Sequence, residues 1–308
     1  MLLIVFIIVI TAALLSQLKR DKTFEALTPT YADGHSSFYK WKGINVHFKD
    51  EGSGIPIIFL HGTSSSLHTW DKLTSYLKNH VRIIRMDLPG FGLTGPHPEK
   101  DYSLNAYIQF LEPFTKYIGV SQFIIAGNSW GGLLAWYYAS QHQQKVAGLI
   151  LIDAAGYRMS KIPKRFLACR YILGRWILRH TMSRWLIKNG LKEVYSISGL
   201  IDNSMVTRYM DLTLRAVNRQ AFLDFIRKRE RPDLKLLQRI QSPALILWGR
   251  LDDMYSVEQA FVFQENLSSA IVAIVENAGH VPMEEAPDVC AGHIREFIDM
   301  LQPRLNYI

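Results

Sequence analysis

Residues 123–141 read FIIAGNSWGGLLAWYYASQ, which is an apolar run, a glycine-rich turn and a second apolar stretch. The run Phe123–Ala126 has the unalternated apolar pattern of a strand covered on both faces, and the residues after the turn have a helical composition. Between them, Gly127-Asn128-Ser129-Trp130-Gly131 places a serine at a sharp strand-to-helix turn, which exposes and aims its hydroxyl. A serine hydroxyl becomes a good nucleophile only when a base accepts its proton. We therefore expect Ser129 to be a nucleophile.

Strands and helices alternate on both sides of this turn. Strands are predicted at Ile55–Leu60, Val81–Met86, Phe123–Ala126, Val146–Ile152, Ala244–Trp248 and Ala270–Val275, and as a pair around the Lys42-Gly43 turn between Tyr39 and Lys49. Helices are predicted at Ser103–Tyr117 and Gly132–Gln141. This order predicts an α/β fold with a mostly parallel central sheet flanked by helices, joined by right-handed crossovers.

A long basic stretch separates the strand ending at Ile152 from the strand beginning at Ala244. At about 90 residues it is too long for a structureless loop. We expect a helical cap over residues 157–231, inserted between the two parts of the core, 38–156 and 232–308. The cap holds 17 Lys and Arg against five Asp and Glu, so it carries +12 and the remainder −4 of the net charge of +8. Either this surface faces anionic lipid headgroups, or long Arg stems cover apolar helix surface while their heads stay in water.

The chain begins with MLLIVFIIVITAALLSQL, in which 15 of 18 residues are apolar and none is charged. As a helix this segment spans about 27 Å, close to the roughly 30 Å of a hydrocarbon core. Lys19, Arg20 and Lys22 follow the apolar run, whereas a secretory signal carries basic residues before it. We expect a membrane anchor over residues 1–18, a polar linker over 19–37, and a cytoplasmic catalytic domain by the positive-inside rule. Export after signal cleavage and a buried core helix are the alternatives.

Composition excludes several classes of protein. With 48% hydrophobic and 20% charged residues the chain is neither disordered nor a multi-span transporter. Cys169 and Cys290 allow one disulfide at most and no metal site built on thiolates. No zinc, aromatic or glycine signature of a nucleic-acid module accompanies the basic charge, so a nucleic-acid partner is not expected. The chemistry below calls for no metal and no cofactor.

A general base and an orienting acid lie downstream of the turn. His280 follows the last predicted strand in Gly279-His280-Val281-Pro282-Met283-Glu284-Glu285, and an imidazole can take the serine proton and return it to a leaving group. Trp248-Gly249-Arg250-Leu251-Asp252-Asp253 ends the strand before it. We prefer Asp252 as the acid that holds the His280 ring, with Asp253 as the alternative. Asp153, directly after the strand Val146–Ile152, is a third candidate, which would also serve as a structural hydrogen-bond acceptor.

Two backbone N–H groups should stabilise the oxyanion of an acyl-transfer reaction. One belongs to Trp130, directly after the proposed nucleophile. The other belongs to the loop His61-Gly62-Thr63-Ser64, which follows the strand Ile55–Leu60, and there we take Thr63 as the donor. The side chain of His61 is expected to be structural.

Six motifs together resemble the α/β-hydrolase fold superfamily. They are HGTSSSLHTW at 61–70, DLPGFG at 87–92, GNSWGG at 127–132, LIDAAG at 151–156, WGRLDD at 248–253 and GHVPMEEAP at 279–287. Over about residues 38–302 the chain is most similar to family V bacterial esterases and lipases and to membrane-anchored monoacylglycerol lipases. The resemblance implies Ser129, Asp252 and His280 as nucleophile, acid and base, and Thr63 and Trp130 as oxyanion donors. It also implies a small-molecule or lipid ester as substrate.

The chain departs from these families at two positions. Trp130 stands where the lipases more often have methionine and resembles the proline iminopeptidases, which however carry a glycine- and proline-rich loop in place of residues 61–64. The usual proline after the catalytic aspartate is missing from Asp253-Met254-Tyr255-Ser256, so the shape of that loop is open.

We expect a serine carboxylic-ester hydrolase with a preference for apolar acyl groups, because the cap contains Phe166, Tyr171, Trp176, Trp185, Phe222 and Phe225. One rival is a C–C bond hydrolase of a ring-fission product, although those enzymes usually have tryptophan where this chain has Val281. The other is a non-catalytic binding protein on the same scaffold.

Overall fold

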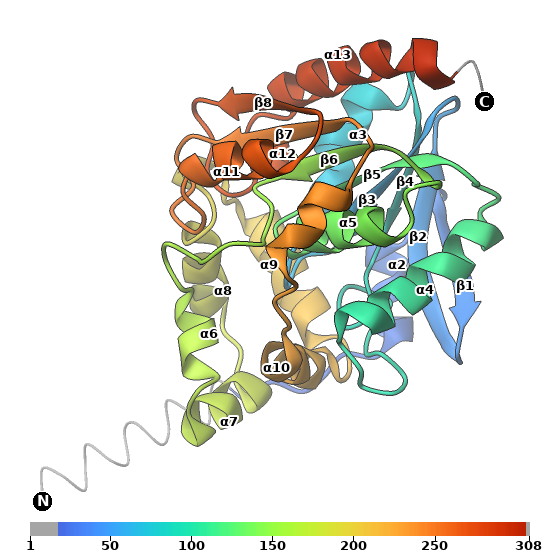
Figure 1. Cartoon of the computed structure of the whole chain (residues 1–308). Helices are drawn as coiled ribbons and strands as arrows, with labels where there is room; N and C mark the ends of the chain where they lie inside the picture. Colours follow the sequence, from blue (N-terminus) through green and yellow to red (C-terminus); the bar gives the residue numbers. More distant parts are fainter. Residues whose placement is uncertain (1–17, 306–308) are drawn as a thin grey trace, which may run out of the picture.

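The apolar runs form one eight-stranded sheet in the computed structural model, which describes residues 18–305 (Figure 1). The strands are β1 (Ser36–Trp41), β2 (Ile44–Glu51), β3 (Pro56–Leu60), β4 (Arg82–Met86), β5 (Phe123–Asn128), β6 (Val146–Ile152), β7 (Ala244–Gly249) and β8 (Ala270–Val275). Their order is β1-β2-β4-β3-β5-β6-β7-β8. The β1–β2 and β2–β4 pairs are antiparallel and the others parallel. All eight predicted strands are confirmed.

Strand β5 lies in the middle of the sheet, which explains its unbroken apolar sequence. It pairs with β3 through Ile57↔Ile124 and with β6 through Ile125↔Leu149, and all its residues are buried. A strand covered on both faces and both edges cannot present polar side chains to water. The carboxyl ends of the parallel strands meet at one edge of the sheet, so the residues just after β5, β6 and β7 are brought close together.

Helices cover both faces of the sheet. On one face α4 (Leu104–Tyr117), α5 (Trp130–Gln141) and α11 (Glu258–Asn266) contribute to one apolar cluster. On the other, α3 (Asp71–Leu77), α12 (Pro282–Glu285) and α13 (Pro287–Leu305) contribute to a second. Both predicted helices, α4 and α5, are confirmed.

The chain between β6 and β7 is helical, as predicted, and it lies to one side of the sheet's carboxyl edge (Figure 1). It consists of α6 (Lys164–Ala168), α7 (Ile172–His180), α8 (Arg184–Lys192), α9 (Asn203–Leu214), α10 (Asn218–Lys228) and the 3-10 helices η2 (Ser198–Leu200) and η3 (Leu234–Arg239). We keep the name cap for residues 157–231.

The aromatic residues of the cap divide into two groups. Phe225 and Phe166 are buried, whereas Tyr171 and Trp185 are about 70% exposed and Trp176 is nearly half exposed. The sequence-based expectation treated them as one set beside the substrate. Only the inward group can serve that purpose, because the amphipathic helices α7 and α8 turn their other aromatic side chains to the outside.

Residues 19–37, expected as a polar linker, contain a packed helix, α2 (Phe24–Tyr31). Leu27 and Tyr31, one turn apart, are buried against Leu93 of the core and Leu212 of the cap. The Tyr31 hydroxyl also donates a hydrogen bond of 3.0 Å to Asp211. The segment therefore packs against both cap and core.

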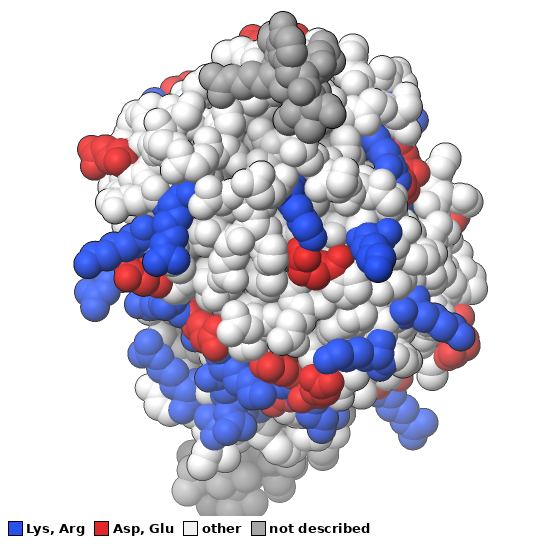
Figure 2. Space-filling model, turned by 45° about the vertical axis from the view of Figure 1, so that its right-hand side comes forward, with Lys and Arg blue, Asp and Glu red and all other residues white. Residues whose placement is uncertain are grey.

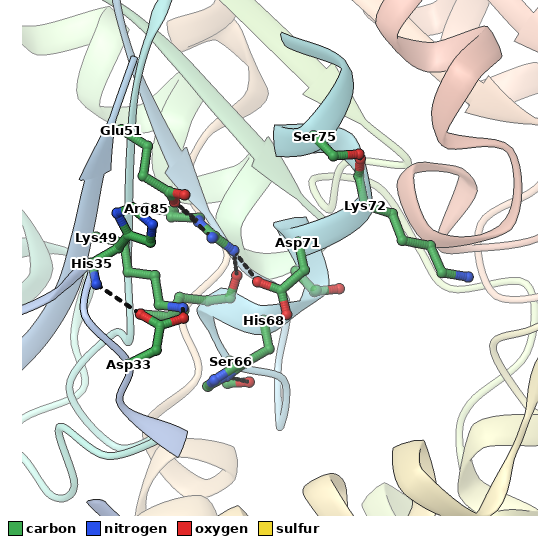
Figure 3. A network of polar contacts seen from close by, with 12 residues as sticks. Asp33, His35, Lys49, Glu51, Ser66, His68, Asp71, Lys72, Ser75 and Arg85 are labelled. Carbon is green, nitrogen blue, oxygen red and sulfur yellow. Dashed lines mark hydrogen bonds and ion pairs between the residues drawn. The ribbon is translucent and has the colours of Figure 1, made fainter. Parts of the chain in front are cut away.

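Ion pairs fix the antiparallel edge of the sheet to the segments around it (Figure 3). Arg85 on β4 is almost fully buried, and its guanidinium contacts Glu51 of β2 at 2.7 Å and Asp71 at the start of α3. Lys49 of β2 pairs with Asp33 at 2.6 Å, just after α2. Because Arg85 has lost its water, these carboxylates are required to balance its charge.

The anchor predicted for residues 1–18 lies almost entirely outside the described residues. Within residues 18–305, no helix has both the length and the apolar character needed to cross a membrane. Leu18 and Lys19, the first described residues, lie along the end of α7, where Lys19 N–H donates to the carbonyl of His180.

Asp87 follows β4 and is a buried centre of hydrogen bonds. Its Oδ1 accepts from Leu67 N–H at 2.7 Å, and its Oδ2 accepts from Leu93 N–H and contacts His47 Nδ1 at 2.9 Å. Burial by itself raises the pKa of Asp87, but the hydrogen bond and charge of His47, with His68 nearby, lower it to about 2. The ordinary value is 3.8, so ionised Asp87 contributes about 2 kcal/mol, present above about pH 4 and lost as the pH falls through 2.

We predict that Asp87→Asn lowers the free energy of unfolding at neutral pH, and that this deficit shrinks in acid. Between about pH 5 and about pH 3 the difference from the wild type should narrow by about 1 kcal/mol, because the wild-type carboxylate loses its advantage as it is protonated. Urea denaturation followed by circular dichroism measures both proteins. A deficit that stays constant over this range would contradict the pKa argument.

Candidate active site

The chain reverses sharply between β5 and α5, and Ser129 occupies the turn. Its φ of +54° with ψ of −116° is a conformation that a non-glycine residue adopts only under constraint. The constraint is visible: Ser129 N–H donates to Ile152 O, and Ser129 O accepts from Leu133 N–H and Ala155 N–H. The turn therefore holds the serine at the start of α5, at the carboxyl edge of the sheet.

The glycines of the turn are required because backbone packs directly on backbone. A Cβ on Gly131 would lie 2.0 Å from the carbonyl oxygen of Leu60 in β3, and one on Gly127 would lie 2.2 Å from that of Gly131. At Gly132 it would lie 2.7 Å from the methyl group of Ala154. The three glycines of the G-x-S-x-G-G pattern are therefore required by the close packing of α5 against β3 and against Ala154 after β6.

His280 and Asp252 come together as predicted. His280 Nδ1 lies 2.8 Å from Asp252 Oδ2, and both side chains are buried. Asp252 Oδ1 accepts from the N–H groups of Met254 and Tyr255 at 2.7 and 3.1 Å. A proline at either of these positions could not donate, so the missing proline leaves the loop free to hold Asp252 with its backbone.

The two alternative acids lie in different surroundings. Asp253 points to the surface, where it pairs with Lys161 at 2.7 Å. Asp153 is fully buried, and its Oδ1 accepts from Gly249 N–H at 3.0 Å. Of the three aspartates, Asp252 alone has a hydrogen bond to the His280 ring among the described residues.

The loop after β3 lies against the serine. A Cβ on Gly62 would come within 3.2 Å of Ser129 Cβ, so the backbone of residues 61–64 borders the nucleophile directly. Within residues 18–305, neither Thr63 N–H nor Trp130 N–H is used in a hydrogen bond to another group. His61 is structural as expected: its Nε2 accepts from Leu88 N–H, so Nδ1 donates to Gly62 O and steadies the loop.

Two side chains that the sequence analysis did not single out hold the His280 loop. Asn128 Nδ2 donates to His280 O at 2.9 Å and to Ile152 O at 3.1 Å. Glu285 accepts from Gly279 N–H with one oxygen and from Ser196 and Ile197 of the cap with the other. Both lie within motifs quoted above, Asn128 beside the serine and Glu285 five residues after the histidine, but only the folded chain shows what they contact.

The cap closes over the serine turn with aromatic and basic side chains. The ring of Phe225 packs edge-on against Trp130 at 4.8 Å between centroids. The guanidinium of Arg229 lies 5.8 Å from both the Trp130 and the Phe166 rings and donates to the Tyr255 hydroxyl. The Tyr255 ring in turn lies 5.6 Å from that of His280. Trp130, the residue after Ser129, thus packs against aromatic side chains of the cap, with the guanidinium of Arg229 beside its ring.

Ser129, Asp252 and His280 are 9%, 6% and 4% exposed, so the site is closed in this structure. The Ser129 hydroxyl makes no hydrogen bond to the His280 ring within the described chain, and in proteins without substrate this bond is often long. The arrangement offers an aimed hydroxyl, a histidine oriented by a carboxylate, and free backbone N–H groups, which are the parts needed for acyl transfer.

Three buried side chains come close together at this point. One carboxylate oxygen each of Asp153 and Asp252 and one ring nitrogen of His280 lie within 4.8 Å of one another, and such residues also form metal sites. The hydrogen bond between Nδ1 and Oδ2 uses two of these atoms on each other. We therefore describe the group as a hydrogen-bonded set.

Comparison with known proteins identifies the family. The sequence model described as "Alpha/beta hydrolase family" matches residues 57–293, well over half of the chain. This stretch contains all the site residues named above.

The relatives differ in the bond they act on. A monoacylglycerol lipase from Xenopus laevis is 25% identical over 283 residues, covering 88% of this chain and 83% of the relative. A 2-hydroxy-6-oxo-6-(2'-aminophenyl)hexa-2,4-dienoic acid hydrolase from Metapseudomonas resinovorans is 26% identical over 265 residues, covering 83% and 88%. Among solved structures, a bacterial membrane phospholipase A superposes with a TM-score of 0.74 at 26% identity, covering 87% of this chain and 86% of the other.

We predict that Gly131→Ala lowers the free energy of unfolding by about 3 kcal/mol or more, because the new methyl group would overlap the main chain of β3. Gly292→Ala is the matched control. Gly292 also lies in a helix, α13, but a Cβ there meets nothing within 4 Å, so this variant should be unchanged or up to about 1 kcal/mol more stable. Thermal and urea unfolding measure both, and equal effects at the two positions would contradict the packing argument.

Proposed function

The chain belongs to the alpha/beta hydrolase family, and on this premise we propose that it is a serine carboxylic-ester hydrolase. The observation that carries the proposal is the buried hydrogen bond between Asp252 and His280 beside the strained turn that aims Ser129. The lipases among its relatives support an ester as the substrate.

In the proposed reaction Ser129 Oγ attacks the ester carbonyl while His280 accepts its proton. Asp252 accepts the hydrogen bond from Nδ1, which leaves Nε2 as the nitrogen that receives the proton. The Asp252 carboxylate also stabilises the imidazolium that forms. The oxyanion is bound by the N–H groups of Thr63 and Trp130. His280 then protonates the leaving alcohol, and a water molecule activated by the same histidine releases the acid from the acyl-enzyme.

The surroundings of Ser129 favour an apolar acyl group. Trp130, Phe225 and Phe166 supply aromatic surface around the turn. Burying an acyl chain against such surface is favourable by about 0.8 kcal/mol per methylene, so the specificity constant should rise with chain length up to the size of the cavity that opens.

C–C bond hydrolysis of a ring-fission product is the second candidate. The dienoic acid hydrolase among the relatives favours it, and Arg229 at the border of the site could hold the substrate's carboxylate. Hydrolysis of such a dienoate faster than of any p-nitrophenyl ester would establish this function in place of the first.

We predict that a fluorophosphonate probe labels the wild type at Ser129 and does not label Ser129→Ala. We also expect the wild type to hydrolyse p-nitrophenyl esters with a kcat/KM that increases from acetate to octanoate.

Asp252→Asn should lower kcat by about 10⁴, because the imidazole loses its acceptor and adopts the wrong tautomer.

Asp253→Asn is the matched control and should keep its activity within about twofold, since Asp253 contacts Lys161 at the surface. Absence of both labelling and ester hydrolysis at every chain length would contradict the proposal and favour a binding role.

We further propose that the protein works at a membrane, anchored by residues 1–18, with the catalytic domain on the cytoplasmic side. The supporting surface lies on α7 and α8, where Ile172, Leu173 and Trp185 are at least two thirds exposed. Arg170, Arg175, Arg179, Arg184 and Lys188 lie on the same two helices or beside them. An apolar surface bordered by cations suits an anionic bilayer.

The course of the chain also favours this orientation. The apolar first segment leads into Leu18, which pairs with Thr181 at the end of α7. The N-terminal end of the described chain therefore emerges beside the exposed face of α7, as Figure 1 shows. On the face drawn in Figure 2, Lys and Arg are interspersed with Asp and Glu and are more numerous in the lower half.

We predict that brominated phospholipid vesicles quench the tryptophan emission of the full chain, more strongly when anionic lipid is included. Trp185→Phe should remove much of the quenching, because Trp185 is 71% exposed on α8. Trp41→Phe is the control, since Trp41 is buried on β1.

An equal loss of quenching in the two variants would contradict the orientation. Intact mass of the protein extracted from membranes tests the anchor itself: loss of residues 1–18 would instead support export after cleavage.

A further inference from the structure

Asp153 is a second buried carboxyl group beside the proposed catalytic acid. It follows β6 and is fully buried. One of its carboxyl oxygens lies within 4.8 Å of an oxygen of Asp252 and of a ring nitrogen of His280. Its φ of +42° is a left-handed conformation, which Asp and Asn adopt more readily than other non-glycine residues. The backbone thus holds this carboxyl group in the site, although the mechanism above gives it no role.

The two carboxyl groups differ in the hydrogen bonds they receive. Asp252 has three contacts that favour a negative charge, from Met254 N–H, Tyr255 N–H and the His280 ring. Asp153 has one, from Gly249 N–H to Oδ1. Its Oδ2 is buried and has no hydrogen-bond partner within residues 18–305. Two buried carboxylates this close cannot both be ionised at moderate cost, so the one with fewer donors holds the proton.

We propose that Asp153 is a positioning residue that stays protonated at neutral pH and donates a hydrogen bond from Oδ2 to the carboxylate of Asp252. The proton occupies the one oxygen of Asp153 that otherwise has no partner. It gives Asp252 a fourth hydrogen bond, which disperses the carboxylate's charge and fixes its plane toward His280.

The electrostatic environment agrees with this assignment. Burial first, and then the charge of Asp252, raise the pKa of Asp153 well above its usual range. His280 also faces it, with a ring nitrogen within 4.8 Å of an Asp153 oxygen. Glu285 on α12 raises this pKa further, and Cys290 on α13 has a thiol pKa that is itself raised by burial and by Asp153.

Asparagine and alanine at position 153 distinguish a neutral donor from an ionised carboxylate. Asparagine keeps the acceptor for Gly249 N–H and supplies an N–H donor to Asp252, so it mimics the protonated acid. Alanine removes both contacts and leaves the charge of Asp252 less dispersed, which strengthens its attraction for a protonated His280. The inference rests on the proposed hydrolase mechanism, and one of its two measurements must therefore not depend on activity.

The activity measurement is the pH dependence of kcat/KM for p-nitrophenyl butyrate. The independent measurement is the midpoint of the His280 ring titration, followed by NMR in protein labelled with ¹⁵N-histidine. The His280→Gln variant assigns the signal. For Asp153→Asn we expect kcat/KM within about threefold of the wild type and both midpoints within about 0.3 pH unit. For Asp153→Ala we expect the midpoints to rise by about half a unit to one unit, with kcat/KM down about tenfold. Asp253→Asn, which removes an exposed carboxylate, should leave both unchanged.

Two results would overturn the proposal. If Asp153→Asn lowers the His280 midpoint by about one unit or more, a negative charge has been removed and Asp153 was ionised. If Asp153→Ala lowers only the melting temperature and leaves the midpoint in place, the residue is merely structural. Should the alanine variant fail to fold, the asparagine result alone decides. Because the ring titration needs no turnover, it can support Asp153 as a donor even if the wild type hydrolyses no ester.

Discussion

The close packing of main chain on main chain at residues 127–132 is the constraint on which the rest of the structure depends. Helix α5 can start directly after β5 only because glycines let its first turn approach the carbonyl groups of β3 and lie against Ala154. This approach forces Ser129 into its unusual backbone conformation, and the following N–H, of Trp130, has no hydrogen-bond partner within residues 18–305. The strain is maintained because the surrounding parallel strands are fully buried and cannot relax.

The histidine and its acid reach the serine through the same edge of the sheet, but their loops are held by neighbours from elsewhere. Asn128, adjacent to Ser129, donates to the carbonyl of His280, so the proposed nucleophile and the proposed base share one support. Glu285 binds Gly279 before the histidine and the cap loop at Ser196 and Ile197. The cap is therefore connected through Glu285 to the loop that carries His280.

The basic charge and the apolar side chains of the cap serve two surfaces. Arg229, Phe225 and Phe166 face the serine turn, while the side chains exposed on α7 and α8 lie outside, beside the point where the described chain begins. One explanation of the cap's charge applies to part of it, because some guanidiniums cover aromatic rings, as Arg165 does over Phe166 and Phe222. Others remain at the exposed face.

The sequence by itself determined the eight strands, the helical insertion and the residues that can take part in the chemistry, because apolar periodicity, glycine spacing and strand ends are local properties. It left Asp252, Asp253 and Asp153 as alternatives, since adjacent positions in a loop differ only in where the chain turns them. The tertiary structure decided that Asp252 contacts His280, that Asp253 is at the surface, and that Asp153 is a second buried carboxyl group. The supposed linker likewise became a packed helix because Leu27 and Tyr31 find partners in the core and the cap, which no local pattern contains.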